Sequence, residues 1–398
     1  VFENAFAPSS HTAPSHASMF TSLYPESHGV LRNGAPLRGE GVTTLAEALR
    51  DRGFATALFP SVNFLSELAE GFEHVEHWVW TDRPDYRRAA ATVQTAIDWL
   101  ESTRERPSVF LVVHLYDVHD HSPRSSPPVS QMNRIRRAMR DDGEPFRRHV
   151  ELVEPEPEKI GSLRRQFLRY DAQLAYVDLE IARLYEAFGR LRGHEETLWI
   201  VTSDHGEGLG DHGLVGHGQH LYNEQLRVPL IVHAPSWDRP AARVPQLVRL
   251  IDLFPTVLEL AGAERSAAEQ TMEGVSLAPL LVTPEASLDI DYVYAQRRPV
   301  DARRAERWEP GLVISAQSLT EKIIYRENGP AEYYDLSRDP NELTNLAEGL
   351  PPDEVPAEAE RLRRWLLDTY SRTHAERPEG SGEVRPEHLE ELEALGYL

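Results

Sequence analysis

Residues 196–201 form an apolar run that ends directly in a loop crowded with Asp, His and Gly. The run is rich in large and β-branched side chains, which predicts a buried strand. The loop spans 202–213, and further Gly and His follow at 216–220. In open α/β sheets the functional sites lie at the carboxyl ends of the strands, so this junction predicts an active site.

Asp204 and His205 are adjacent in this loop. Together they offer the oxygen and nitrogen donors that hard or borderline divalent metal ions accept. The glycines let the backbone fold tightly around a bound group. The alternative is a polar loop whose histidines cap turns. The density of His, Asp and Gly favours a metal or catalytic site.

The composition limits the partners of the chain. Its 398 residues include 42 Lys and Arg against 64 Asp and Glu, a net charge of −22. This balance argues against nucleic acid or an anionic membrane surface as the main partner. The absence of cysteine excludes disulfides, thiolate metal sites and a cysteine nucleophile, and it favours no cellular compartment.

No apolar run is long enough to span a membrane, and the first residues do not have the pattern of a signal peptide. The chain opens at Val1, within what reads as folded sequence. We therefore expect an N-terminal piece to be missing.

Predicted strands and helices alternate along the chain, as in an α/β protein. Residues 124–157 are rich in Pro, Arg and Glu, and we expect a surface excursion that is able to cover the site. The patterns predict strands at 1–7, 54–59, 108–113 and 224–232, helices at 43–52, 87–100, 163–190 and 248–261, turns at 24–30 and 333–342, strands of a smaller region at 292–295 and 322–325, and helices at 358–370 and 386–398.

Two other segments carry chemistry-bearing side chains. The predicted strand 108–113 runs into His114, Asp117 and His119. Near the N-terminus, Thr12 lies in a hydroxyl-rich loop that takes on a helical pattern. A hydroxyl at a helix N-terminus is either a cap or a nucleophile whose developing charge faces free N–H groups. The local sequence alone favours the cap.

In combination, these segments resemble the sulfatase family of the alkaline phosphatase superfamily across essentially the whole chain. The matching motifs are Asn4-Ala5-Phe6, Pro14-Ser15, Tyr24-Pro25 with His28-Gly29-Val30, Ser203-Asp204-His205-Gly206-Glu207, Gly216-His217-Gly218, Leu221-Tyr222-Asn223-Glu224, Arg227-Val228-Pro229-Leu230, Asp252-Leu253-Phe254-Pro255-Thr256, Glu273-Gly274-Val275-Ser276-Leu277, Tyr334-Asp335-Leu336 with Asp339-Pro340, and Leu395-Gly396-Tyr397-Leu398. So many motifs in the same order make the resemblance specific.

The departures from the family pattern affect the expected chemistry. In sulfatases the nucleophile position carries Cys or Ser that is oxidised to formylglycine, whereas here it is Thr12. We therefore expect no formylglycine. Relatives in the superfamily that act on phosphate esters use a bare Thr or Ser, which shifts the expectation toward phosphorus esters. The arginine of the family pattern is replaced by His16, and the usual lysine aligns with His217.

The resemblance also implies roles for individual residues. Thr12 is expected to be the nucleophile and to bind the metal with Asp204 and His205. The resemblance gives catalytic positions at the ester group and leaving oxygen to His119 and His217, and substrate-binding positions to His16, His114 and Lys322. The expected cofactor is one divalent ion, Ca²⁺, Mn²⁺ or Zn²⁺. Three ligands fall short of the four or more such ions take, and the family supplies the others from a first strand that we expect outside this sequence.

The sequence therefore predicts an α/β, alkaline-phosphatase-like sandwich with a large mixed sheet between helices and a smaller C-terminal sheet subdomain. We expect a catalytic domain at 1–265 and a C-terminal subdomain at 266–398. The predicted function is metal-dependent hydrolysis of a small anionic ester, with a phosphate mono- or diester favoured. The alternatives are sulfuric ester hydrolysis and a non-catalytic, sulfatase-like binding protein. The leaving group and the oligomeric state have no readable motif.

Overall fold

The computed structural model describes residues 1–37, 41–78, 86–119, 127–141, 143–153, 156–235, 241–263, 272–297, 300, 310–350, 356–375, 377–378 and 381–395. Its central sheet is mixed. The order is β5 (Trp199–Thr202), β8 (Arg227–His233), β1 (Phe2–Phe6) and β9 (Val244–Arg249). Strand β8 runs antiparallel to β5 and β1, whereas β9 runs parallel to β1.

A second sheet contains the parallel strands β3 (His74–Val75), β2 (Ala55–Phe59) and β4 (Val109–Val113). Helices α4 (Ala89–Ser102) and α7 (Ile160–Arg192) pack on it, and Trp199 of β5 belongs to the same hydrophobic cluster. The edge strands β4 and β5 therefore share one core. We predicted one large sheet, but within the described ranges these strands form two sheets.

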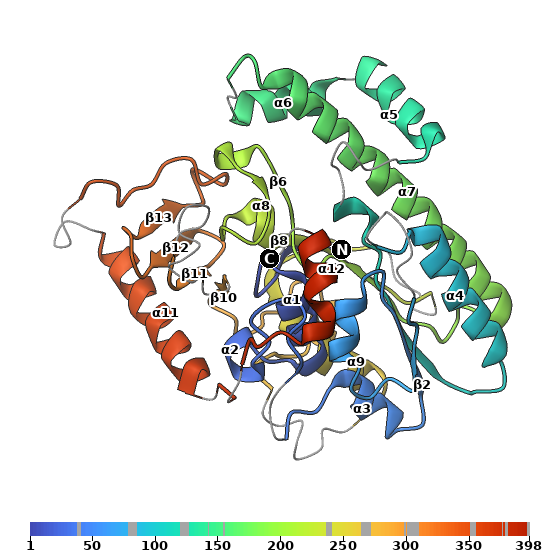
Figure 1. The fold of residues 1–398 in the computed structure, drawn as a ribbon. Coiled ribbons are helices and arrows are strands. Elements are labelled where there is room, and N and C mark those ends of the chain that lie inside the picture. The colour runs from blue at the N-terminus through green and yellow to red at the C-terminus, as the bar shows by residue number, and fades with distance from the viewer. Residues whose placement is uncertain are drawn as a thin grey trace.

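The smaller C-terminal sheet is an antiparallel meander. It consists of β10 (Val293–Gln296), β11 (Val313–Gln317), β12 (Glu321–Arg326) and β13 (Glu332–Asp335). Helix α11 (Ala357–Ala375) buries its apolar face against this sheet (Figure 1). The predicted mixed sheet and small C-terminal sheet are thus both present. In the part of the chain that the structure describes, no helix has the length and apolarity of a membrane span.

The excursion predicted at 124–157 is helical where it is described. Its helices α5 (Val129–Asp141) and α6 (Glu144–Val153) lie beside α7 in Figure 1. The apolar side chains Met132, Ile135 and Met139 recur every three or four residues, which gives α5 one apolar stripe. Phe146 of α6 packs edge-on against Phe167 of α7, with 5.5 Å between the ring centroids. The excursion is therefore packed onto the long helix.

Local signals set several element boundaries. Helix α3 (Leu45–Arg50) begins after Thr44, which forms a capping box with Glu47. Pro255 lies in the first turn of α9 (Leu253–Leu260), where its missing N–H costs no helical hydrogen bond. The predicted turn at 24–30 contains a short helix, α2 (Pro25–His28), since proline at N1 is compatible with a helix start. The terminal helix is α12 (Leu389–Ala394), and 396–398 lie outside the described residues.

Candidate active site

Segments that follow strands β1, β4 and β5 bring their side chains together in a buried cluster. Helix α1 (Thr12–Thr21) begins directly after the loop that follows β1, and every residue of it is buried. Its N-cap residue is His11, which makes no side-chain capping bond. Thr12 is thus the first helical residue, and its Oγ1 lies 3.3 Å from Nε2 of His205. The hydroxyl faces the loop after β5.

The tautomer of His205 follows from its second contact. Its Nδ1 lies 2.8 Å from the carbonyl oxygen of Gly206, which can only accept a hydrogen bond. Nδ1 must therefore carry the proton, and in the neutral ring Nε2 presents a lone pair to Thr12. Burial lowers the pKa of His205, so the neutral ring predominates near pH 7.

Only glycine fits at position 206, because the neighbouring backbone leaves no room for a side chain. A Cβ atom there would lie 2.0 Å from the carbonyl oxygen of Glu224. Any other residue would push the loop away from the chain that follows it, and would move the neighbouring Asp204 and His205 away from Thr12. The glycine thus holds the two candidate metal ligands in place.

Asp204 is the anionic centre of the cluster. Its Oδ2 lies 3.5 Å from Nε2 of His205 and 3.6 Å from Nδ1 of His16. Burial alone would raise the pKa of Asp204, but His205, His16 and His114 outweigh burial and lower it to about 2. Oδ2 is buried and accepts no hydrogen bond. A buried carboxylate oxygen without a donor is open to a cation.

His16 and His114 lie beside this carboxylate. Nδ1 of His16 donates to the carbonyl oxygen of Thr12 over 2.9 Å, which ties the ring to the helix start. The ring of His114 packs edge-on against that of His16, with 5.1 Å between the centroids. Burial lowers the pKa of His114 to about 3, so this ring is neutral at any working pH of the protein.

His119 and His217 form a second imidazole pair. Their Nε2 atoms are 3.2 Å apart, so one proton lies between the two rings. Nδ1 of His217 donates to Oε2 of Glu207 over 2.9 Å, and the hydroxyl of Tyr116 lies 2.9 Å from Nε2 of His119. His217 also stacks on His205, with 4.2 Å between the centroids. The three rings therefore connect Thr12 with Glu207.

Lys322 lies apart from this cluster. Its ammonium group is fully buried, forms an ion pair with Glu342 and donates to Oδ1 of Asn223 over 3.1 Å. Neither partner contacts Thr12 or Asp204 within the described ranges. A buried ion pair thus satisfies its charge, and the substrate contact of Lys322 stays a prediction.

Asp117 stabilises the start of a helix and does not face the cluster around Thr12. Its side chain pairs with Arg88 at 2.7 Å and accepts from the backbone N–H of Ala89 over 2.7 Å, which holds the start of α4. The strand preceding it delivers His114 and His119 to the site, whereas Asp117 points to the helix.

The residues present fit part of a divalent metal site. Thr12, Asp204 and His205 offer three donor atoms, and the spacings that involve Nε2 of His205 are 3.3 and 3.5 Å. Two ligands with bonds of about 2.1 Å on one tetrahedral ion lie roughly 3.4 Å apart, so these spacings suit a shared ion. Within the described ranges no group of three or more His, Asp or Glu side chains is arranged to hold a metal.

Three contacts that support the site were not predicted. Oδ1 of Asn33 accepts from the backbone N–H of Ala13 over 2.8 Å, which satisfies an N–H of the first helical turn. The hydroxyl of Ser15 donates to the carbonyl oxygen of Asp204 over 2.5 Å, which ties helix to loop. Glu207 stands in the predicted motif, so its position was visible in the sequence, whereas its hydrogen bond to His217 was not.

A model of the family described as Sulfatase matches residues 1–263, well over half of the chain. The chain belongs to the sulfatase family. A second model, for the C-terminal part of N-sulphoglucosamine sulphohydrolase, matches residues 210–364 of this sulfatase-family chain. The resemblance predicted from the motifs is thereby confirmed.

Choline-sulfatase of Rhizobium meliloti is 30% identical over 217 residues, and the match covers 52% of this chain but only 39% of that relative. Among solved structures, BT4656 in complex with its substrate D-glucosamine-2-N,6-O-disulfate has a TM-score of 0.70 at 19% identity, over 96% of this chain and 92% of that one. The phosphonate monoester hydrolase SpPMH from Silicibacter pomeroyi also has a TM-score of 0.70 at 19% identity, over 94% and 88%. The predicted fold class is confirmed.

Proposed function

We propose that this sulfatase-family protein hydrolyses a small anionic ester, with Thr12 as the nucleophile and a phosphorus ester as the preferred substrate. The observation that carries the proposal is the buried hydroxyl of Thr12 at the start of α1, 3.3 Å from the lone pair of His205. A hydroxyl at a helix start is positioned where free N–H groups and the helix dipole favour an approaching anion.

The chain's own residues have distinct tasks in this proposal. Thr12, Asp204 and His205 would hold a divalent ion, and this ion would supply positive charge that lowers the pKa of the hydroxyl. The Oγ1 of Thr12 releases its proton to solvent and forms a bond to phosphorus while the bond to the leaving oxygen breaks. The proton shared by His119 and His217 passes to that leaving oxygen. The oxygen of a water molecule then forms a bond to phosphorus while the bond between phosphorus and Oγ1 breaks. This water gives a proton back to the His119–His217 pair, and Oγ1 of Thr12 takes a proton from solvent.

Glu207 supports the proton transfer. It accepts from Nδ1 of His217, which fixes the orientation of this ring. Nε2 of His217 is thereby held toward His119, where the proposed proton transfer starts. The stacked ring of His205 keeps His217 beside the nucleophile.

Thr12 also carries the preference for phosphorus over sulfur. Threonine is not a formylglycine precursor, so the route open to this side chain is direct attack by an alcohol. The structural similarity to a phosphonate monoester hydrolase supports this reading. Sulfuric ester hydrolysis is the second candidate, supported by the 30% identity to choline-sulfatase.

The deciding experiment compares initial rates for an aryl phosphate, an aryl phosphodiester, an aryl phosphonate and an aryl sulfate, each with added Mn²⁺, Zn²⁺ or Ca²⁺. We expect a phosphorus ester to give the highest kcat/KM, and quenched reactions to contain phosphorylated Thr12 in peptide mass spectra. Dominant sulfate turnover would refute the phosphorus preference. Turnover without any covalent adduct at Thr12 would refute the nucleophile.

A further inference from the structure

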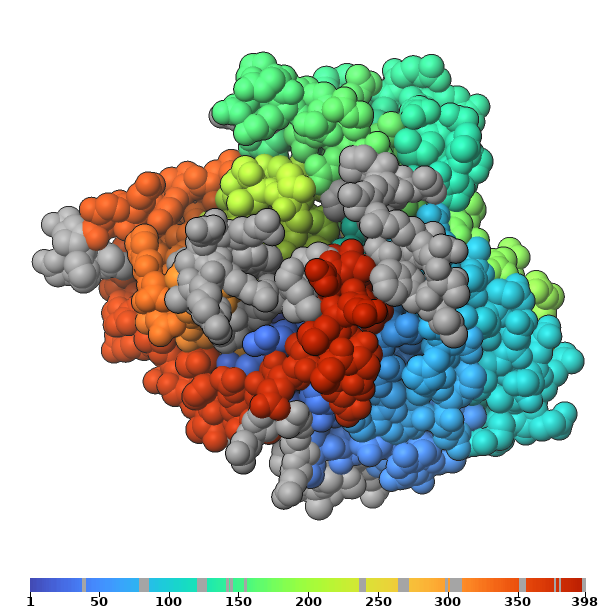
Figure 2. All heavy atoms as spheres, in the orientation of Figure 1, coloured from blue at the N-terminus to red at the C-terminus, as the bar shows by residue number. Residues whose placement is uncertain are grey.

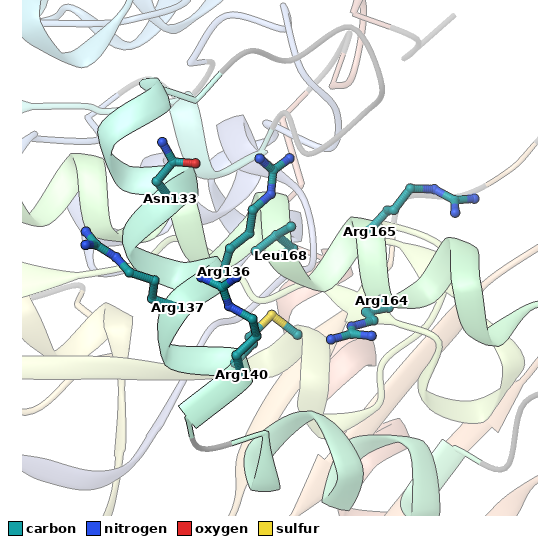
Figure 3. Close-up of a pocket in the computed structure, with 8 residues that line it drawn as sticks. Asn133, Arg136, Arg137, Arg140, Arg164, Arg165 and Leu168 are labelled. Atoms are coloured by element: carbon teal, nitrogen blue, oxygen red, sulfur yellow. The ribbon is translucent and has the colours of Figure 1, made fainter.

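A groove between helices α5 and α7 is lined by arginine side chains (Figure 3). Arg136, Arg137 and Arg140 come from α5, whereas Arg164 and Arg165 come from the first turns of α7. Asn133, Met139 and Leu168 complete the lining of a pocket of about 690 Å³. This volume suits a ligand larger than a single sulfate or phosphate ion.

These five arginines differ from the arginines of the molecule that form ion pairs. The chain has a net charge of −22, with 64 acidic residues available as partners. Elsewhere arginines form close ion pairs, as Arg249 does with Asp252 at 2.7 Å and Arg326 with Glu332 at 2.7 Å. Within the described ranges none of the five groove arginines forms an ion pair or a side-chain hydrogen bond. A group of unpaired cations in an acidic protein leaves its charge available for a ligand.

The packing of α5 keeps these charges together at the surface. Its apolar residues Met132, Ile135 and Met139 are partly buried beside α7, whereas Arg136 and Arg140 are exposed. Residues 136 and 140 are neighbours on one helix face because they are four positions apart. Guanidinium groups stay charged at every physiological pH, so their mutual repulsion persists until an anion binds.

We propose that this arginine groove binds a soluble polyanion that carries two or more sulfate or phosphate groups. The planar guanidinium fork binds such groups through paired hydrogen bonds, and each charge-assisted bond is among the stronger ones that proteins make. Arginines on two facing helices can engage separate oxyanions of one ligand. The groove is therefore a binding site distinct from the cluster around Thr12.

The lining residues favour this ligand over other polyanions. No aromatic side chain lines the groove, so it offers no surface on which nucleobases stack. The net charge of −22 opposes the approach of an extended nucleic acid or an anionic membrane surface. A compact, soluble polyanion can enter the groove without contacting the acidic remainder of the protein.

Helix α6, which lies between α5 and α7 in the chain, contacts the segment beyond the candidate metal-ligand loop. Nε2 of His149 in α6 lies 2.8 Å from the carbonyl oxygen of Leu209 in β6 (Gly208–Leu209). Nδ1 of the same ring lies 3.9 Å from Asp211. The groove on α5 and α7 is therefore adjacent in the chain to a helix that contacts the active-site segment.

The test uses the full chain and two probes, a heparin-derived hexasaccharide and inorganic triphosphate, in titration calorimetry at two salt concentrations. The double variant Arg136→Glu, Arg165→Glu changes the groove. The matched control Arg243→Glu, Arg338→Glu changes net charge equally at exposed surface pairs. We expect the groove variant to bind about tenfold more weakly or worse, the control to change less than about twofold, and affinity to fall with salt.

The two probes distinguish the sources of the oxyanions. Binding of the hexasaccharide alone identifies a sulfated saccharide, and binding of triphosphate alone identifies a phosphorylated small molecule. The neutral variant Arg136→Gln, Arg165→Gln should weaken binding of both probes. Its unfolding temperature should stay unchanged or rise, because the repulsion between the guanidinium groups is reduced. Equal losses in groove and control variants would overturn the proposal. Absence of binding to both probes, or binding only to phosphatidylserine vesicles or single-stranded DNA, would also overturn it.

Discussion

Replacement of Thr12 by alanine separates the two roles that a hydroxyl at this position could have. The N-cap of α1 is His11, so Thr12→Ala removes no capping bond. It removes the contact from Oγ1 to Nε2 of His205 and one buried methyl group. Thr12 is almost completely buried, with 1% of its surface exposed, so water does not compensate for either loss.

The stability cost is small compared with the expected loss of activity. A lost hydrogen bond of this length costs about 1 kcal/mol, and a buried methyl costs about 1 kcal/mol more. A total of roughly 2 kcal/mol leaves a typical protein folded. Loss of the nucleophile should lower kcat by about 10³-fold or more. Thr12→Ser keeps the reacting oxygen, so we expect it to retain activity within about tenfold of the wild type.

The assay measures kcat for the preferred aryl ester with alanine, serine and wild-type proteins, and thermal unfolding of each provides the control for folding. Alanine should be inactive but folded, whereas serine should be active. A folded Thr12→Ala protein with normal turnover would remove Thr12 from the mechanism. If both variants lost activity at equal stability, Thr12 would have a packing role in the site and would not be the nucleophile.

Three further perturbations follow from the contacts. Asp204→Asn removes the anionic ligand, so calorimetric titration with Mn²⁺, Zn²⁺ and Ca²⁺ should show at least a tenfold loss of metal affinity; unchanged binding would place the metal elsewhere. Glu207→Gln removes the carboxylate that orients the ring of His217, so kcat should fall more for esters with poor leaving groups than for nitrophenyl esters, and an equal fall for both would contradict the assignment. Burial tends to lower the pKa of His388, but Glu391 and Glu67 outweigh it and raise this pKa. The resulting stabilisation is fully present below about pH 6.5 and is lost as the pH rises through the raised pKa. The Tm difference between wild type and His388→Asn should therefore be larger at pH 6 than at pH 8.5, and a constant difference would disprove it.

Sequence reasoning identified most of the residues that lie together around Thr12 because of where strands end. Thr12, His119 and His205 each follow a predicted strand, and the chemistry-bearing residues after β1, β4 and β5 do converge. Residue types in such a loop identify candidates without any knowledge of distance. The pairing of His119 with His217 could not be predicted, because it depends on how two loops almost a hundred residues apart are placed.

Lys322 shows the limit of this reasoning. It stands on a strand and matches a family position, but Glu342 neutralises it from a turn twenty residues later. Whether a lysine is a substrate contact or half of a buried ion pair depends on a partner that sequence spacing does not reveal. The excursion at 124–157 depends on distant packing in the same way. The apolar stripe of Met132, Ile135 and Met139 is compatible with a helix, but the helix is stabilised only when this stripe packs against α7.

The charges around Thr12 support the proposal that a cation binds in this site. Asp204 is anionic because its pKa is about 2, whereas burial keeps His114 and His205 neutral near pH 7. Within the described ranges no lysine or arginine contacts Asp204 or these rings. An anionic ester would therefore meet a carboxylate and neutral imidazoles, and the Coulomb energy between like charges in a buried site opposes its binding. A divalent ion at the open Oδ2 of Asp204 would make the local charge net positive. It would satisfy a buried oxygen, attract the substrate and lower the pKa of the Thr12 hydroxyl, so the three requirements of the proposed reaction would meet at one atom of the loop.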